Sequence, residues 1–189
     1  MSLLYAHDTL ILDANCVISL YASKQMANIL AAIPKTITIA AYVSENEALW
    51  VYSEPDESGQ RTKEPILLQP LIDTGLLHIV TIQSEDEAEI FATFAAMIRD
   101  QGEAITGAIA FKRNWAIVVD DEKARRLFHQ NASHLQLIYM LELVKHWVEV
   151  DSPPDEIITA TLQNIRKRAT YTPRNQHPLY KWWHSNGGS

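Results

Sequence analysis

The sequence has few of the residues and segments that mark several common classes of protein. Its 189 residues include one cysteine, Cys16, so a disulfide within the chain is excluded. No stretch approaches the roughly 20 apolar residues that a membrane-spanning helix needs. The first fifteen residues contain His7, Asp8 and Asp13 and lack the cationic start and apolar run of a secretory signal. We therefore expect a cytoplasmic protein that does not enter a membrane.

Short motifs of the major enzyme classes are also missing. The chain contains no G-x-S-x-G, no G-K-[ST] and no G-x-G-x-x-G, which excludes the usual signatures of serine hydrolases, NTPases and dinucleotide-binding enzymes. Its seven histidines include no H-E-x-x-H motif, and no C-x-x-C accompanies them. A zinc site is therefore not expected.

Charge is unevenly distributed along the chain. The 16 Lys and Arg residues are outnumbered by 23 Asp and Glu residues, which gives a net charge of −7 at pH 7. This balance argues against a non-specific nucleic-acid binder. However, no acidic residue follows Glu156, whereas five cations do. The sequence thus combines an acidic body with a basic tail, and the tail also holds Tyr171, Tyr180, Trp182 and Trp183.

Apolar and β-branched runs alternate with helical patterns over most of the chain. Such alternation predicts a mostly parallel sheet flanked by helices. The expected strands are 9–13, 37–40, 77–82, 115–119 and 135–139, and the expected helices include 16–33, 42–52, 67–77, 102–113, 120–128, 141–148 and 155–167. Ser84 and Glu87 have capping-box spacing and predict the start of a further helix. The polar segment 53–65 is predicted to be an exposed loop or the tip of a hairpin. We expect one domain over 1–150, with 151–189 forming a helix and a basic aromatic tail that packs on it or extends from it.

Acidic residues stand at the predicted junctions between strands and helices. Asp13 follows the first strand, and the pair Asp120 and Asp121 follows the apolar run WAIVV. Glu103 lies in the first turn of a predicted helix. Because the carboxyl ends of parallel strands share one edge of a sheet, these side chains are expected to converge there. Clustered carboxylates repel one another unless they are protonated or bridged by a hard cation such as Mg²⁺.

Each acid also has a purely structural explanation. Asp13 and Asp120 could cap the turns that follow them, and Glu103 is favoured near a helix N-terminus by the helix dipole. The joint pattern favours a metal site, because separate capping residues need not fall at successive junctions of one sheet.

These motifs together resemble the PIN-domain nucleases, the group that includes toxins of VapBC-type toxin–antitoxin pairs. The resemblance covers about residues 10–127, and a weaker similarity continues to about Arg168. It is carried by L-I-L-D-A-N, by Q-G-E-A-I-T-G-A and by V-V-D-D-E-K-A-R. It implies a three-layer α/β/α sandwich that binds Mg²⁺ or Mn²⁺ and cleaves RNA. By the same resemblance, a homodimer and a small antitoxin partner are expected.

The resemblance assigns Asp13, Glu103 and the aspartate pair to the metal and adds a further acid from the helix over 42–52. That acid is either Glu45 or Glu47, which lie on roughly opposite faces of a helix, and we prefer Glu45. Of the pair, Asp121 is placed slightly ahead of Asp120, and both are kept. Asn15 matches a small polar position of the family and is expected to hydrogen-bond a ligand or water.

Several cations are predicted near the acidic edge, where they could neutralise phosphates of a nucleic acid: Arg113, Lys123, Arg125 and Arg126. Three other functions stay open. The chain could be a non-catalytic scaffold whose acids are caps, or its nuclease activity could be directed at DNA. A receiver-type signalling domain also clusters aspartates at strand ends, but its acidic pair follows the first strand, whereas here the pair comes late.

Overall fold

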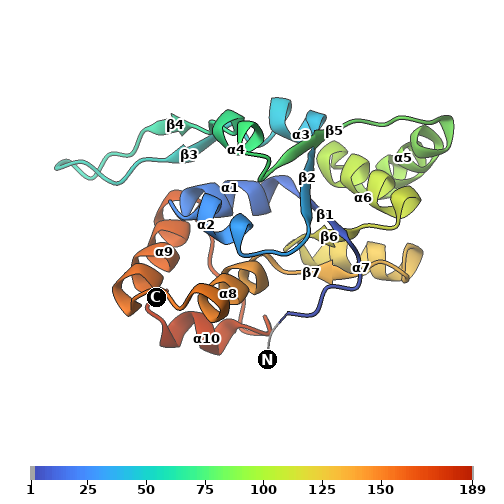
Figure 1. The fold of residues 1–189 in the computed structure, drawn as a ribbon. Coiled ribbons are helices and arrows are strands. Elements are labelled where there is room, and N and C mark those ends of the chain that lie inside the picture. The colour runs from blue at the N-terminus through green and yellow to red at the C-terminus, as the bar shows by residue number, and fades with distance from the viewer. Residues whose placement is uncertain (1–2, 189) are drawn as a thin grey trace.

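A five-stranded parallel sheet forms the centre of the computed structural model, which describes residues 3–188 (Figure 1). The strands lie in the order β5-β2-β1-β6-β7, and each neighbouring pair is parallel. Their bounds are β1 Thr9–Leu12, β2 Thr36–Ala40, β5 His78–Val80, β6 Ala116–Val118 and β7 Leu137–Ile138. The predicted α/β class and the mostly parallel sheet are confirmed.

Helices cover both faces of this sheet, as in a three-layer α/β/α sandwich. On one side lie α5 (Glu85–Ile98), α6 (Gln101–Arg113) and α7 (Glu122–Asn131). On the other lie α1 (Ala14–Ala22), α2 (Met26–Ala31), α8 (Met140–Asp151) and α9 (Asp155–Arg168). The short helices α3 (Ala41–Asn46), α4 (Gln69–Asp73) and α10 (Tyr180–Ser185) complete the described chain.

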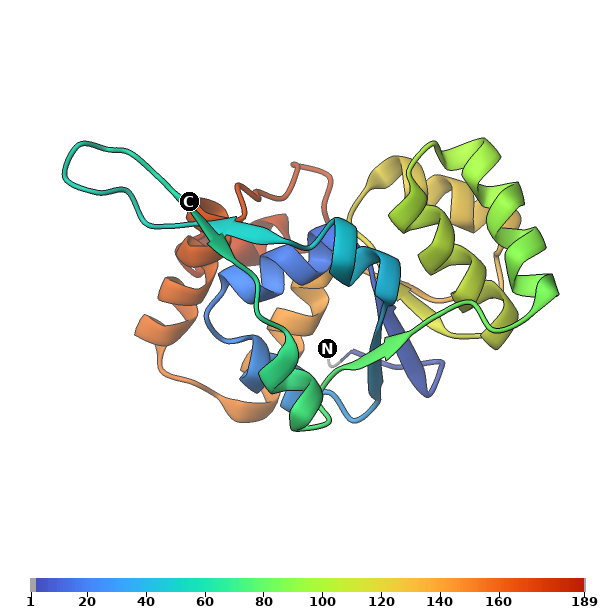
Figure 2. The same ribbon diagram turned by 90° about the horizontal axis from the view of Figure 1, so that it is seen from above.

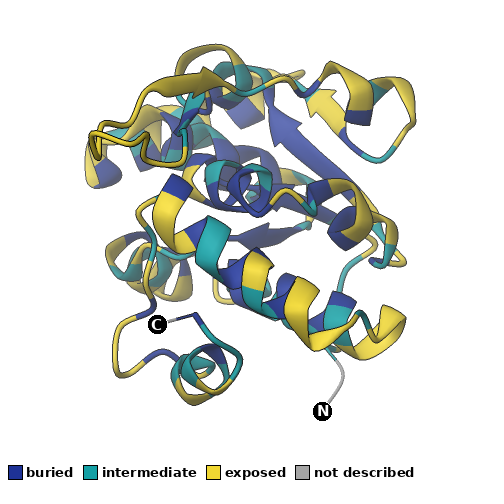
Figure 3. Cartoon of the chain, turned by 90° about the vertical axis from the view of Figure 1, so that its left-hand side faces the viewer, coloured by how far each residue is buried: buried dark blue, intermediate teal, exposed yellow. Residues whose placement is uncertain are grey.

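The core is formed by apolar side chains of the central strands and of the helix faces that meet them. Leu10, Ile11 and Leu12 of β1 are all fully buried, because β1 lies in the middle of the sheet with helices on both sides. Figure 3 shows the buried residues in the strands and the inner helix faces, and the exposed residues on the outside. Small residues of α6, such as Ala104 and Ala108, are also fully buried and let this helix lie close to the sheet.

Two predicted helices differ from the structure. The predicted helix over 16–33 is divided into α1 and α2, because Lys24 adopts a left-handed conformation with φ 62°. The predicted helix over 42–52 is wrong in its second half, since α3 ends at Asn46 and residues 50–52 form a strand. Val51 of that strand is fully buried, and its pairing with a later strand stabilises the extended conformation. The capping box at Ser84 is confirmed, because its side chain accepts a hydrogen bond from the Glu87 N–H.

A two-stranded antiparallel hairpin projects from the body of the molecule (Figure 2). It consists of β3 (Trp50–Tyr52), β4 (Lys63–Pro65) and the turn between them, and is called the arm. The segment 53–65, predicted as a loop or hairpin tip, thus forms the tip and second strand of the arm.

The C-terminal segment packs on the body. Helix α9 lies against α1, and Trp183 of α10 is fully buried. Arg168 at the end of α9 is also buried and donates hydrogen bonds to the Ala22 and Tyr52 carbonyls. Its guanidinium also pairs with Glu64 of the arm. No helix within residues 3–188 combines the length and the apolar character needed to cross a membrane.

Candidate active site at the carboxyl edge of the sheet

The fold brings five carboxylates toward the edge at which β1 and β6 end. Asp13 directly follows β1, and Asp121 follows β6 and caps α7. Asp100 and Glu103 stand at the start of α6, and Glu47 follows the last residue of α3. Electrostatic coupling joins them, because each of the other four acts on the ionisation of Glu103. These five residues, Asp13, Glu47, Asp100, Glu103 and Asp121, are called the carboxylate cluster.

Asp13 is the most deeply buried member of the cluster. Its exposed fraction is 2%, and its Oδ2 atom is buried without a hydrogen-bond partner. Burial is the main cause that raises the pKa of Asp13 to about 7, and the nearby carboxylates of Asp100 and Glu47 raise it further. A buried carboxylate oxygen without a partner is costly, because the charged form loses its hydration and gains nothing in return.

Glu103 is the member of the cluster on which all four other carboxylates act. Burial raises the pKa of Glu103 to about 8, and the other four carboxylates add to the shift, with Asp13 contributing most among them. In the part of the chain that the structure describes, none of the five carboxylates forms an ion pair with Lys, Arg or His. The cluster therefore brings together five acidic groups that no cationic side chain among residues 3–188 neutralises.

Backbone N–H groups at helix starts hold three members of the cluster. Asp100 accepts a hydrogen bond from the Glu103 N–H at 2.9 Å, and Asp121 Oδ1 accepts from the N–H groups of Lys123 and Ala124, each at 2.8 Å. Glu47 Oε1 accepts from the Gly102 N–H at 3.0 Å. These bonds fix the carboxylates at the sheet edge, and they also satisfy helix N-termini as ordinary caps do.

Gly102 makes the position of Glu47 possible. A Cβ atom on residue 102 would lie 1.8 Å from Glu47 Oε2, so a side chain there would displace the carboxylate. The glycine thus serves close approach between the end of α3 and the start of α6, and the sequence Q-G-E places it one residue before Glu103.

The structure brings Glu47, and not the preferred Glu45, to the cluster. Glu45 is exposed on α3, whereas Glu47 is half-buried beside Gly102, and burial followed by the charge of Asp100 raises the pKa of Glu47. The physical reason is the early end of α3. The chain leaves the helix after Asn46, so Glu47 turns toward the neighbouring helix instead of following the helical repeat.

Asp120 and Asp121 have different surroundings. Asp121 acts on Glu103, whereas Asp120 Oδ1 accepts a hydrogen bond from the Met140 N–H at 2.9 Å. Burial raises the pKa of Asp120 to about 6, and hydrogen bonds from Met140 and from the Tyr171 hydroxyl oppose that shift. Asp120 thus contacts the C-terminal segment. Both aspartates, together with Asn15 and Tyr171, line a hollow of about 230 Å³, where Asn15 is exposed in the first turn of α1.

Two residues near the acids were not predicted from the sequence. Asp100 caps α6 and belongs to the cluster, and the D-x-x-E spacing of Asp100 and Glu103 was a usable signal for it. Tyr171 donates to Asp120 from a segment more than fifty residues further along the chain. No local pattern marks such a contact.

The four predicted cations are not equivalent. Arg113 lies at the other end of α6 from Glu103, about 15 Å along the helix, so its predicted place near the acidic edge is wrong. It donates to both carboxylate oxygens of Glu87 instead. Arg125 is half-buried, donates to the Val119 and Leu137 carbonyls and stacks over Tyr139. Lys123 and Arg126 are exposed on α7, which begins next to Asp121.

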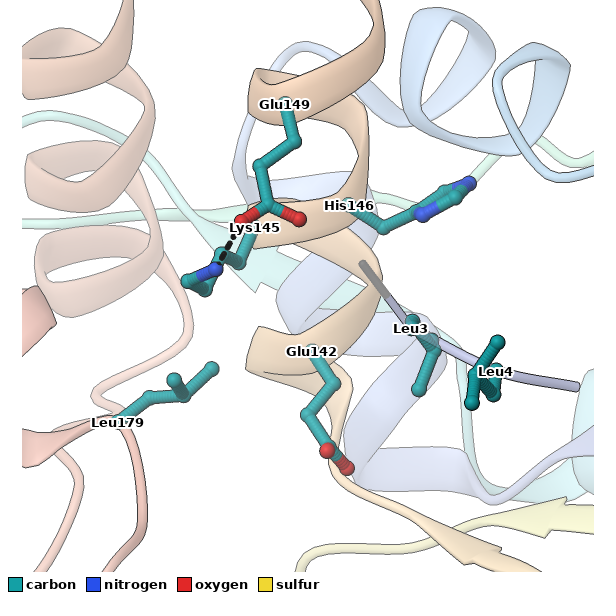
Figure 4. Close-up of a pocket in the computed structure, with 7 residues that line it drawn as sticks. All are labelled: Leu3, Leu4, Glu142, Lys145, His146, Glu149 and Leu179. Atoms are coloured by element: carbon teal, nitrogen blue, oxygen red, sulfur yellow. Dashed lines mark hydrogen bonds and ion pairs between the residues drawn. The ribbon is translucent and has the colours of Figure 1, made fainter. Parts of the chain in front are cut away.

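No preformed metal cage is present in the described region. Within residues 3–188, no three His, Cys, Asp or Glu side chains are arranged to hold a metal ion together. A larger hollow of about 490 Å³ lies between the N-terminal segment, α8 and Leu179 (Figure 4). It is lined by leucines and by Glu142, Lys145, His146 and Glu149, and no member of the carboxylate cluster contributes to it.

Comparisons with protein-family models, with curated proteins and with solved structures give no match for this chain.

Proposed function

We propose that this protein is a PIN-like, Mg²⁺- or Mn²⁺-dependent nuclease that hydrolyses phosphodiester bonds in RNA. The observation that carries the proposal is the carboxylate cluster, in which Asp13, with its buried and unpartnered Oδ2, is grouped with four further acids, and none of the five has a cationic partner among the described residues. The ionised form of such a cluster is unfavourable by itself, because its members are buried and repel one another, and a bound cation would compensate for this.

The residues of the cluster fit a hard divalent ion. All of the candidate ligands are carboxylate oxygens, which Mg²⁺ and Mn²⁺ prefer. Asp13, Glu103 and Asp121 would hold the ion, with Glu47 and Asp100 adding negative charge around it. Because no three side chains stand in a ready arrangement, the acidic side chains must rotate to share an ion. Asp121 would then exchange its bonds to the Lys123 and Ala124 N–H groups for the ion.

The chemistry follows from the charge of the site. When bound, the ion would neutralise the carboxylates, polarise the phosphate and lower the pKa of an attacking water. The chain contributes positioning. Asp13 and Asp121 are fixed by the ends of β1 and β6, and Lys123 on α7 offers a positive charge for a phosphate next to the scissile one. The water would lose a proton as its oxygen forms the new bond to phosphorus, and the bond to the leaving oxygen would break as that oxygen takes up a proton, so no covalent enzyme intermediate is needed.

The choice of RNA, the small antitoxin, the homodimer and the cytoplasmic location belong to the same proposal. They rest on the resemblance of D-A-N, Q-G-E-A and V-V-D-D-E-K-A-R to the toxin ribonucleases. Purification of the protein with its natural partners tests them, and a copurifying short chain supports the toxin assignment.

A non-catalytic scaffold is the second candidate. It is favoured by the fact that Asp100 and Asp121 both cap helices and so have a structural use without a metal. This alternative predicts no binding of divalent ions.

Calorimetric titration with Mn²⁺ and cleavage of single-stranded RNA with and without EDTA decide between the candidates. Wild type should bind Mn²⁺ and cleave only with the ion. Asp13→Asn should lose Mn²⁺ binding, and its cleavage rate should fall by about a thousandfold, comparable to the loss of one strong electrostatic group in other active sites. Glu45→Gln is the matched control and should behave as wild type. Full metal-dependent cleavage by Asp13→Asn would refute the assignment.

A further inference from the structure

The two faces of the arm have different residues and different surroundings. In the register of the hairpin, Tyr52 pairs with Lys63 and Val51 with Glu64. Side chains alternate between the two faces of a strand, so Trp50, Tyr52 and Lys63 share one face and Val51 and Glu64 share the other. Val51 is fully buried, whereas Trp50 and Tyr52 are partly exposed and Lys63 is exposed. The arm thus has an inner face against the body and an outer face.

The outer face combines two aromatic rings with two cations. Trp50 and Tyr52 meet edge to face, with ring centroids 4.9 Å apart. The Lys63 ammonium lies 3.8 Å from the centroid of the Trp50 ring, and the Arg61 guanidinium lies 4.6 Å from that of Tyr52. Aromatic rings stack on nucleic-acid bases, and neighbouring cations neutralise the phosphates between them.

Most acids of the arm are engaged away from this face. Glu64 pairs with the buried Arg168 on the inner side, and Glu54 pairs with Lys24 of the body at 3.0 Å. Asp56 accepts hydrogen bonds from the Ser58 and Gln60 N–H groups within the turn, and Glu57 lies in the same turn at the tip. The charges beside the two aromatic rings are therefore positive, although the arm as a whole contains more acids than bases.

The outer face also begins next to the candidate active site. Only Ala48 and Leu49 separate Glu47 of the carboxylate cluster from Trp50, and because the chain turns here, the two residues lie at most about 10 Å apart. In Figure 2 the arm leads outward from the end of α3. A strand whose phosphate lies at the cluster could continue along the arm without leaving the protein surface.

We propose that the outer face of the arm binds a single-stranded segment of the nucleic-acid substrate. Bases stack on Trp50 and Tyr52, and the flanking phosphates pair with Arg61 and Lys63. The inference deepens the proposed function, because it relies on that function for the kind of substrate and adds where the strand beyond the scissile phosphate is held.

Fluorescence anisotropy with a labelled 12-residue oligouridylate in EDTA tests the proposal without cleavage. The double variant Arg61→Ala/Lys63→Ala should weaken binding by about tenfold or more and reduce the slope of log K against log salt by about 1.4, which corresponds to two phosphate contacts on a single strand. Trp50→Ala should weaken binding about tenfold through lost stacking. Thermal unfolding of both variants should match wild type, since Val51 and Glu64 keep the arm attached.

A matched control removes the same charge elsewhere. Lys35→Ala/Lys112→Ala also loses two cations, and both lie in ion pairs outside the arm, with Asp8 and Asp86. This variant should bind the oligonucleotide nearly as wild type does. Equal affinities and salt slopes for the arm variant and the control would overturn the proposal and leave the arm's outer face to a protein partner.

A small diester separates this inference from the proposed function. Bis(p-nitrophenyl) phosphate is too short to reach the arm, so the arm variants should hydrolyse it with Mn²⁺ at the wild-type rate. Oligonucleotide binding through the arm by a wild-type protein that hydrolyses no diester would support the inference while the nuclease assignment fails. Hydrolysis of the diester together with unchanged oligonucleotide binding by the arm variants would refute the inference alone.

Discussion

Two buried carboxylates in this protein have opposite electrostatic environments. Glu87 is 4% exposed, and Arg113 donates to both of its oxygens at 2.7 and 3.0 Å. That hydrogen-bonded guanidinium lowers the pKa of Glu87. Asp13 is 2% exposed, has no cationic partner, and burial raises its pKa to about 7.

The difference shows that burial alone does not explain the state of Asp13. The same fold neutralises one buried acid with a bidentate arginine and leaves the other among four further acids. A structural role is sufficient for Glu87, because its pair with Arg113 joins the first turn of α5 to the last turn of α6. Backbone hydrogen bonds from Ala14 and Asn15 offset only part of the effect of burial on Asp13, and a functional role accounts for this environment better.

The largest effect is expected from breaking the neutralised pair. Glu87→Gln leaves the largely buried Arg113 without its counter-charge, and the free energy of unfolding should fall by about 3 kcal/mol. For a chain of this size, the melting temperature should drop by about 6–12 °C. Glu89→Gln, an exposed glutamate on the same helix, is the control and should change little. Equal melting temperatures for the two variants would show that the pair contributes nothing to stability.

The pH dependence of stability should reflect the carboxylate cluster. Asp13 and Glu103 hold their protons in the folded state up to about pH 7 and 8, but lose them near pH 4 when unfolded. Between these limits the folded state binds more protons, so its stability falls as the pH rises. Without divalent ions, the melting temperature should decrease by roughly 5 °C from pH 6.5 to 8.5.

The range from pH 6.5 to 8.5 excludes the effect of His177. Burial lowers the pKa of that residue to about 4, so it changes the stability only at pH values below 6.5. Addition of Mn²⁺ should reverse the decrease through preferential binding to the folded state. A melting temperature that stays level or rises over this range would contradict the assigned pKa values.

Asp13→Asn should act in the opposite direction to Glu87→Gln. The amide removes a buried charge, so at pH 8 without divalent ions the free energy of unfolding should rise by about 1–2 kcal/mol. At pH 5, where folded Asp13 is protonated, the gain should be smaller, and it should disappear only below about pH 4, where the unfolded chain also holds the proton. Differential scanning calorimetry at both pH values measures this difference. A loss of stability at pH 8 would mean that the Asp13 carboxylate stabilises the fold.

The smallest of these effects should separate the two candidate glutamates of the α3 region. Glu47→Gln should weaken Mn²⁺ binding by about tenfold, the range typical for groups around a metal site. Glu45→Gln should leave the affinity unchanged, because Glu45 is exposed and outside the cluster. Calorimetric titration of both variants measures the two affinities for Mn²⁺. A larger loss of affinity in Glu45→Gln than in Glu47→Gln would restore Glu45 as the acid that this region contributes to the site.

The sequence was sufficient to predict the sheet and most of the acidic edge. Runs such as LIL and WAIVV are apolar because they lie in a parallel sheet covered on both faces, and an acid within two residues after such a run must lie near the strand's carboxyl end. Asp13 and Asp121 could therefore be placed without coordinates.

Other features depend on contacts between distant parts of the chain. The helical pattern through residues 42–52 gave no sign that Val51 would pair with Glu64 across an intervening polar segment. The early end of α3 then moved the acidic position from Glu45 to Glu47. Arg113 was misplaced for a simpler reason, since ten helical residues carry it to the other end of α6 from Glu103.

Arg168 connects three parts of the molecule that are far apart in sequence. Its guanidinium donates to the carbonyl at the end of α1 and to that of Tyr52, and it also pairs with Glu64, so the last turn of α9 fixes the base of the arm. Removal of α9, or replacement of Arg168 by a neutral residue, would remove the buried attachment of the hairpin to the body and leave the exposed ion pair of Glu54 with Lys24. Shortened versions of this chain would therefore keep their acidic residues while losing the fixed orientation of Trp50 and Tyr52.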